Sequence, residues 1–251
     1  MKFYPKINIL IPLAGLGKRF SDAGYTVPKP FIDLGGKSMI KSVIENIRIP
    51  NSRYIFVLNE SLLPVLDFMK HVVSSDVEFR IITTPTATEG PASTCLLAKE
   101  EINSETPLIV INCDQIIRDF DFRFFLDFTW IHDCDGVLGC FISESPKNSY
   151  VKLNSEGQIT ETAEKKVISN FATNGLHYWK RGSDFVGSTE EMIRSDDRCN
   201  GEFYVAPTFN YLIKSGKKIM PYFFNMHFPV GIPEDLEKYQ TVIQKIENGS
   251  H

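Results

Sequence analysis

The chain has 251 residues, of which 43% are hydrophobic and 12% aromatic, so it can bury a sizeable core. Its net charge of −4 provides no overall positive field for nucleic acid or an anionic membrane, and any phosphate binding must therefore be local. We find no apolar run long enough to span a membrane and no signal-peptide core near the N-terminus. We therefore expect a cytoplasmic protein, a monomer or homo-oligomer, with no nucleic-acid or membrane partner.

Strand-like and helix-like segments alternate through the first half of the chain, which predicts an α/β sheet. Apolar, β-rich runs predict strands over residues 7–13, 54–58, 79–83 and 107–112. Helices are expected over residues 39–47, with Ser38 as the N-cap, and over 61–73 and 92–102.

The second half has shorter strands with hairpin-like turns between them. These strands are predicted over residues 136–142, 150–153, 158–162, 173–179 and 219–224. Helices are predicted over residues 182–194, 203–215 and 233–246. No stretch has the composition of a flexible linker, so we expect one continuous domain.

The five cysteines form no CxxC pair, which argues against a disulfide framework and against a zinc site. Cys113 and Cys140 lie inside apolar runs and are expected to be small core residues. The histidines are dispersed and form no metal-spaced pair. We expect them to be structural, with His177 and His227 as candidates to line a substrate pocket.

The stretch 7–40 has the chemistry of a phosphate-binding loop. A strand runs directly into residues 14–19 (AGLGKR), and Lys29 follows between two prolines. Such a loop can present backbone N–H groups and positive charge to a phosphate. The dinucleotide fingerprint fails because Phe20 stands at its third glycine, and the P-loop pattern fails because only one residue separates the two glycines. A tight strand-to-helix turn would explain the glycines, but not the convergence of three cations.

Residues 13–19 (LAGLGKR), 28–30 (PKP) and 36–40 (GKSMI) resemble, in order and spacing, the signature of the sugar-1-phosphate nucleotidyltransferases, also called nucleotide-sugar pyrophosphorylases. The resemblance implies a Rossmann-like, three-layer α/β/α mixed sheet of the nucleotide-diphospho-sugar transferase type. It implies one domain over residues 1–248, with a nucleotide-binding half to about residue 135 and an acceptor-binding half from about residue 136.

The resemblance also assigns the nucleotide contacts. The loop would wrap the triphosphate with Leu13, Ala14, Gly15, Leu16, Gly17, Lys18 and Arg19. In the family the arginine that ends the loop and the lysine of the Pro-Lys-Pro segment contact phosphates, so Arg19 and Lys29 are candidate catalytic residues. A later loop approaches the base and ribose, which here implicates Thr88, Glu89 and Gly90. The alternative interpretation of that loop is the N-terminus of a helix, with Pro91 in its first turn.

The metal candidate is Asp114, directly after the strand predicted over 107–112. A carboxylate there needs a cation or donors, and Mg²⁺ binds through one or two carboxylates plus substrate phosphate oxygens. In the resembled family this aspartate is a metal ligand; otherwise it would cap a helix over residues 116–120. Many members carry a second aspartate two residues before a later glycine, but this chain has Pro229 there, so Asp235 is the candidate substitute.

The acceptor contacts follow from the second half of the resemblance. A Glu-Lys pair, Glu164 and Lys165, would bring its lysine to the acceptor phosphate and makes Lys165 a candidate catalytic residue. Asn174 and Gly175 stand where the sugar packs, and Glu202 would face its hydroxyls. The alternatives are an exposed turn for Lys165 and a first-turn acid for Glu202. Lys18 departs from the small Ser or Thr that is common at its position.

The resemblance implies a Mg²⁺-dependent nucleotidyltransferase that joins a nucleoside triphosphate (NTP) to a phosphorylated small molecule. The acceptor expected first is a sugar 1-phosphate, with the nucleotide sugar used for surface polysaccharide synthesis. Open alternatives are a cytidylyltransferase acting on a phosphocholine-like acceptor, a nucleotide-sugar-dependent glycosyltransferase, and a non-catalytic nucleotide sensor. Such glycosyltransferases usually carry Asp-x-Asp after the central strand. This chain has Asp114-Gln115 at that place without the second aspartate, which argues against a glycosyltransferase. The base, the acceptor and the second metal ligand stay open.

Overall fold

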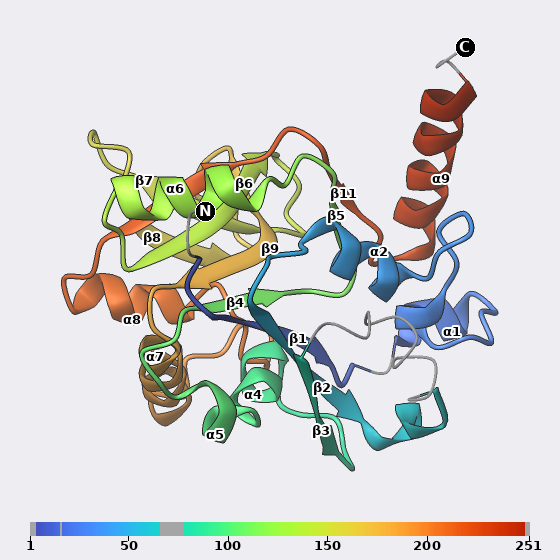
Figure 1. The fold of residues 1–251 in the computed structure, drawn as a ribbon, viewed down its shortest axis with the longest axis horizontal. Helices are drawn as coiled ribbons and strands as arrows, with labels where there is room; N and C mark the ends of the chain where they lie inside the picture. Colours follow the sequence, from blue (N-terminus) through green and yellow to red (C-terminus); the bar gives the residue numbers. More distant parts are fainter. Residues whose placement is uncertain (1–3, 16, 66–77, 249–251) are drawn as a thin grey trace.

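The computed structural model describes residues 4–15, 17–65 and 78–248, and it contains a mixed sheet of nine strands (Figure 1). Seven strands follow one another across the sheet in the order β10-β6-β9-β4-β1-β2-β3, and β7 and β8 form a hairpin attached to β9. The bounds along this path are β10 Ile219–Phe223, β6 Gly136–Ile142, β9 Phe171–Trp179, β4 Leu108–Ile111, β1 Ile7–Leu13, β2 Ser52–Asn59 and β3 Glu78–Thr84. The hairpin strands are β7 Ser149–Leu153 and β8 Ile159–Glu164.

The centre of the sheet is parallel and apolar. β1 pairs in parallel with β2 and β4, and every residue of β4 is buried. Strands covered on both faces read as continuous hydrophobic runs, which is why the runs in this chain predicted them. β9 runs antiparallel to both of its neighbours, and its register places Leu176 opposite Ile111. The middle of β9 therefore lies beside the carboxyl end of β4.

Helices cover both faces of the sheet and give three layers (Figure 1). One apolar core joins the sheet to α2 Met39–Asn46, α6 Phe122–Ile131 and α9 Pro233–Asn248. A second core joins the opposite face to α4 Pro91–Leu96, α5 Lys99–Ile102, α7 Gly182–Arg194 and α8 Thr208–Lys214. The three-layer α/β/α mixed sheet expected from the sequence is confirmed.

Most predicted elements are present, with three differences in the helices. Residues 92–102 form two short helices, α4 and α5, separated at Leu97 and Ala98. The helix predicted from residue 203 begins only at Thr208, because the backbone of Phe203 forms hydrogen bonds with Glu89 and Ala92 instead. The described part of the helix predicted over 61–73 is a 3₁₀ segment, η2 Glu60–Val65, and the rest lies outside the described residues.

A small two-stranded sheet and α6 were not predicted from the sequence. β5 Gln115–Ile117 pairs antiparallel with β11 His227–Pro229, so the segment after Asp114 is a strand and not the helix considered as an alternative. A three-residue strand has too little sequence for an apolar pattern to reveal it. This small sheet joins the end of β4 to the segment that leads into α9.

Candidate active site

The glycine loop after β1 lies against the segment that contains Lys29. Gly17 is the N-cap of the short helix α1 Lys18–Asp22, with a φ of 62°. A Cβ atom at Gly17 would stand 3.0 Å from the Cβ of Lys29, so glycine permits this close approach. Lys29 begins the 3₁₀ segment η1 Lys29–Phe31, between two prolines. Leu16 lies outside the described residues.

Lys29 and Asp114 form a largely buried ion pair at the carboxyl ends of β1 and β4. Lys29 Nζ lies 2.5 Å from Asp114 Oδ2, and the two side chains are 19% and 18% exposed. Burial disfavours the charged ammonium, but the neighbouring Asp114 outweighs it and holds the pKa of Lys29 above its ordinary value. Burial likewise opposes ionisation of Asp114, but Lys29 overrides it and holds the pKa of Asp114 below its ordinary value. Both groups are therefore charged at neutral pH.

A hydrogen-bond chain runs from this ion pair into the small sheet. Gln115 Nε2 donates to Asp114 Oδ1 over 2.9 Å, and Gln115 Oε1 lies 2.6 Å from His227 Nε2. Asp114 can only accept, so the amide nitrogen must face it and the amide oxygen must face His227. His227 is therefore the donor at Nε2. Burial lowers the pKa of His227 to about 4, so the ring is neutral in this chain of contacts.

Gly231 keeps one side of the Asp114 carboxylate open. The backbone N–H of Val230 donates to the Asp114 carbonyl over 2.9 Å. A Cβ atom at Gly231 would stand only 2.8 Å from Asp114 Oδ2. Asp235 lies in the first turn of α9, where its carboxylate is 3.7 Å from Lys238 Nζ. Within the described residues no three His, Cys, Asp or Glu side chains cluster as a metal site.

A pocket of about 180 Å³ opens beside the Lys29–Asp114 pair, between β9, the β7–β8 hairpin and the segment before α8. It is lined by Pro91, Asn112, Gln115, Lys147, Asn148, Ser149, Glu164, Thr173, Gly175, His177, Tyr204, Val205 and Ala206. Gly175 has a φ of 81°, and a Cβ there would stand 2.9 Å from Gln115 Cγ and 3.0 Å from Asn112 Nδ2. Gly175 thus brings the backbone of β9 next to the residues that follow β4.

Lys165 reaches this region through a chain of polar contacts. It follows β8 directly and adopts a positive φ of 52°. Its Nζ donates to the hydroxyl of Tyr204 and lies 4.4 Å from the centre of that ring, and the hydroxyl donates in turn to Glu202. Glu164 accepts a hydrogen bond from Ser149, and burial raises the pKa of Glu164. The predicted acceptor residues Glu164, Lys165 and Glu202 are therefore brought together.

The loop predicted to approach the base is joined to the segment that holds Glu202. Phe203 N donates to the Glu89 carbonyl over 2.8 Å, and the Glu89 carboxylate pairs with Arg198 at 3.0 Å. A Cβ at Gly90 would stand 2.5 Å from the Phe203 carbonyl oxygen, so only glycine fits between these backbones. The Thr88 hydroxyl donates within the loop to the Gly90 carbonyl. The loop is thereby held at one wall of the pocket.

One predicted acceptor residue points away from the pocket in this structure. Asn174 is buried with its side chain against Gly139, and Oδ1 accepts from the Leu176 amide over 3.1 Å, while the pocket is lined by its neighbours Thr173 and Gly175. Successive residues of a strand point to opposite faces, which explains the difference. Arg19 is exposed on α1, makes no ion pair within the described residues, and lies near enough to Lys29 for its charge to oppose the raised pKa of that lysine.

Seven polar residues that line the pocket were not predicted from the sequence: Asn112, Gln115, Lys147, Asn148, Ser149, Thr173 and Tyr204. Gln115 and Asn112 flank Asp114 after a buried strand, and polar residues after such a strand were the available signal. Tyr204 had no signal of its own, because only tertiary contacts bring it to Lys165. Among the cysteines, burial raises the pKa of Cys113 to about 12, which keeps its thiol protonated, as expected of a core residue.

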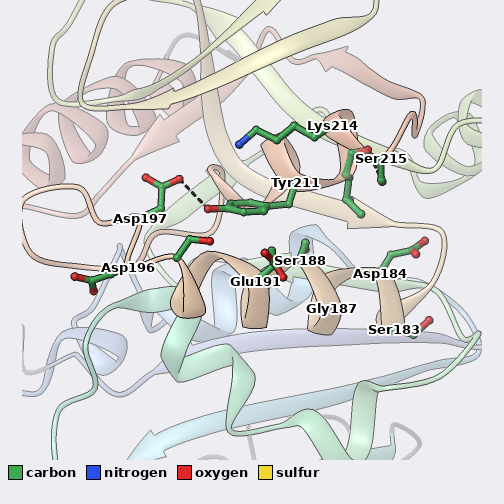
Figure 2. A pocket seen from close by; sticks show the side chains of 12 residues that line it. Ser183, Asp184, Gly187, Ser188, Glu191, Asp196, Asp197, Tyr211, Lys214 and Ser215 are labelled. Carbon is green, nitrogen blue, oxygen red and sulfur yellow. Dashed lines mark hydrogen bonds between the residues drawn. The ribbon is translucent and has the colours of Figure 1, made fainter.

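A second hollow, of about 970 Å³, lies between α7 and α8 and is lined by polar side chains (Figure 2). In it the Tyr211 hydroxyl donates to Asp197 Oδ2 over 3.0 Å. None of its lining residues is a predicted site residue, and it shares no residue with the pocket beside Asp114. The larger hollow is therefore separate from the candidate active site.

The described part of the chain contains no helix long and apolar enough to cross a bilayer. A family model described as nucleotidyl transferase matches residues 9–238. The chain belongs to the nucleotidyl transferase family. This family membership confirms the resemblance seen in the sequence, and the match includes the glycine loop, Lys29, Asp114 and the segment after Gly231.

Named relatives of this nucleotidyl transferase family member are sugar-phosphate enzymes. It is 26% identical over 182 residues to a mannose-1-phosphate guanyltransferase of Schizosaccharomyces pombe, covering 68% of this chain and 49% of that protein. A similar protein of Yarrowia lipolytica is 26% identical over 177 residues, covering 67% of this chain and 48% of that protein. The chain thus spans about half the length of the curated relatives it matches.

Solved structures match over nearly the whole chain. A nucleoside-diphosphate-sugar pyrophosphorylase from Vibrio cholerae RC9 has a TM-score of 0.79 and 25% identity, covering 93% of this chain and 99% of that one. A UDP-glucose pyrophosphorylase complexed with UDP-glucose has a TM-score of 0.78 and 18% identity, covering 95% and 98%. At that identity the second likeness shows the fold alone.

Proposed function

We propose that the protein transfers a nucleotidyl group from an NTP to a sugar 1-phosphate, giving a nucleotide sugar and pyrophosphate. The observation that carries this proposal is the Lys29–Asp114 pair, which stands beside the glycine loop at the carboxyl ends of β1 and β4. Ligands of open α/β sheets bind at this edge. The family match and the sugar-phosphate relatives support the same chemistry.

The reaction needs positioning and charge neutralisation more than proton transfer. An oxygen of the acceptor phosphate attacks the α-phosphorus, the bond from that phosphorus to the bridging oxygen breaks, and pyrophosphate leaves with its electron pair. The attacking oxygen is already anionic at neutral pH, so a general base is unnecessary. Lys29 and Arg19 would hold the triphosphate, and Lys165 would hold the acceptor phosphate. Tyr204 and Glu202 orient the Lys165 ammonium.

The residues present fit a Mg²⁺ ion at Asp114. The carboxylate is ionised, and Gly231 leaves open the side of Oδ2 that a larger residue would fill. Asp114 would hold the ion together with substrate phosphate oxygens and waters, and Asp235 is the candidate second acid. When bound, the ion would neutralise charge on the phosphate oxygens. Gln115 and His227 hold the carboxylate in place for this role.

The acceptor pocket favours a small, polyhydroxylated molecule. Amide, hydroxyl and carboxylate groups line it together with Gly175. The product would serve polysaccharide synthesis in the cytoplasm. A cytidylyltransferase for a non-sugar acceptor stays the second candidate, because an inositol-1-phosphate CTP transferase from T. maritima has the same fold at a TM-score of 0.69 and 15% identity.

The decisive experiment measures pyrophosphate release. Purified protein with Mg²⁺ is given GTP, UTP, CTP, dTTP or ATP together with mannose, glucose, galactose or N-acetylglucosamine 1-phosphate, inositol 1-phosphate or phosphocholine. Turnover with one NTP and one sugar 1-phosphate is the expected result. Turnover only with CTP and phosphocholine or inositol phosphate would favour the second candidate, and hydrolysis of nucleotide sugars without NTP use would favour a glycosyltransferase.

A further inference from the structure

His177 is a buried polar side chain whose two ring nitrogens have no protein partner within the described residues. The residue is 4% exposed and lines the pocket beside Asp114. It follows Gly175 by two residues on β9, and side chains two apart on a strand share a face. Thr173, Gly175 and His177 thus form one row that runs along the pocket.

The imidazole is held in place by aromatic packing. Its ring centre lies 6.1 Å from that of Phe209, in a stacked arrangement, and 6.1 Å from that of Trp179. Burial lowers the pKa of His177 to about 4, although backbone groups of Gly175 and Val110 oppose this shift without reaching hydrogen-bond geometry. At neutral pH the ring is therefore uncharged and carries one N–H donor and one acceptor.

A polar ring without hydrogen-bond partners is unfavourable in a protein core. Leaving a buried donor or acceptor unsatisfied destabilises the folded state, whereas a phenylalanine among the same aromatic neighbours would avoid that cost. Trp179 Nε1 and Thr189 Oγ1 are also buried with no partner among the residues that the structure describes, but neither residue lines the pocket. His177 differs from them because it is a lining residue of the pocket beside Asp114.

We infer that His177 is a specificity residue of the acceptor pocket: it exchanges a hydrogen bond with a neutral substituent, a hydroxyl or an N-acyl carbonyl, on the sugar ring of the acceptor. The inference rests on the proposed function and names the part of the acceptor that this chain selects. An anionic phosphate does not fit at this point, because an uncharged, buried imidazole cannot balance its charge. The phosphate instead belongs near Lys165, and the ring between it and His177.

The test combines a variant of His177 with analogues of the acceptor. The acceptor is the sugar 1-phosphate with the highest turnover in the pyrophosphate screen, and each of its ring hydroxyls is replaced in turn by hydrogen. Loss of one hydrogen bond within a buried site lowers kcat/KM about 5- to 100-fold. We expect His177→Phe to lower kcat/KM for the acceptor by such a factor while KM for the NTP stays within about twofold.

The decisive comparison is between the two changes together. With the wild-type protein, kcat/KM for one deoxy analogue should be lower than for the parent acceptor by the same factor. With His177→Phe, kcat/KM should be the same for that analogue and the parent acceptor, because both changes remove the same contact. His177→Gln, which keeps a donor and an acceptor, should recover part of the loss. Thr189→Val is the matched control: it removes a buried, unpartnered hydroxyl outside the pocket and should leave every acceptor constant unchanged.

The melting temperature of the variant distinguishes a role of His177 in acceptor binding from a purely structural role. His177→Phe should melt at the wild-type temperature or above it, since no protein hydrogen bond is lost. The inference would be overturned if all deoxy analogues lowered kcat/KM equally in both proteins. It would also be overturned if a fall in the melting temperature of His177→Phe explained the lost activity. The proposed function would stand in either case. Absence of pyrophosphate release from the wild-type protein with every sugar 1-phosphate would overturn the proposed function and the inference with it.

Discussion

Lys29 and Asp114 are 85 residues apart in the chain, and their side chains meet at 2.5 Å. The proximity of Gly17 to Lys29 and of Gly231 to Asp114 means that two glycines border this single ion pair. Three distant segments of the chain thus converge where β1 and β4 end.

Lys29→Ala should slow nucleotidyl transfer by at least about 100-fold, because a cation fixed at the transferring phosphate would be lost. It should also lower the free energy of unfolding by about 3 kcal/mol, since Asp114 would stay buried without its partner. Steady-state pyrophosphate release and urea unfolding measure the two effects. Lys6→Ala is the control: it breaks an exposed pair with Glu78 at 2.8 Å and should change neither quantity by much. A Lys29→Ala protein with wild-type turnover would refute the role of Lys29.

Gly231→Ala should impair function without a matching loss of stability. Its Cβ would displace the Asp114 carboxylate, 2.8 Å away, from the place where a metal ion and phosphate would meet it. We expect Mn²⁺, used as a spectroscopic substitute for Mg²⁺, to bind at least about 10-fold more weakly in the presence of NTP, as when a group that orients a metal ligand is changed. Gly187→Ala on α7 has open space around its Cβ and is the matched control. Unchanged Mn²⁺ affinity in Gly231→Ala would contradict this account of Asp114.

Tyr204→Phe should weaken use of the acceptor while leaving the NTP constants unchanged. The hydroxyl that joins Lys165 to Glu202 would be lost, and the ammonium would keep its charge without its fixed direction. One such hydrogen bond is worth about 1 kcal/mol, so KM for the acceptor should rise about fivefold. Tyr211→Phe removes a hydroxyl that bonds Asp197 in the separate hollow and should have no effect on kinetics. An equal rise in both Michaelis constants would indicate a general structural defect instead.

The stability of the protein should depend on His177 in acid. The folded-state pKa of His177 is about 4, below its ordinary value of 6.5, so between these values the unfolded chain binds a proton that the folded chain does not. The folded state therefore loses stability as pH falls from about 6.5 towards 4, by up to about 3 kcal/mol. His177→Phe lacks this loss, so the difference in melting temperature between variant and wild type should widen over that range. A constant difference from pH 7 to 4 would show that His177 is not buried in its neutral form.

The sequence by itself determined the central strands and the chemical identity of the nucleotide loop. The runs that form β1, β2 and β4 are mostly apolar because these strands are covered on both faces, and that pattern is local. The glycines and cations of residues 14–19, with Lys29, likewise stand within one short stretch. Asp114 could be singled out because it follows a buried strand directly.

Only the tertiary structure decided which side chains act on one another. Gln115 and His227 are 112 residues apart, and they meet because β5 and β11 pair, although each strand has only three residues and no readable pattern. The direction of Asn174 depends on the face that its position on β9 presents, and the contact between Lys165 and Tyr204 depends on how the segment before α8 lies against the hairpin. Contacts of this kind arise from the packing of distant elements, which no local periodicity encodes.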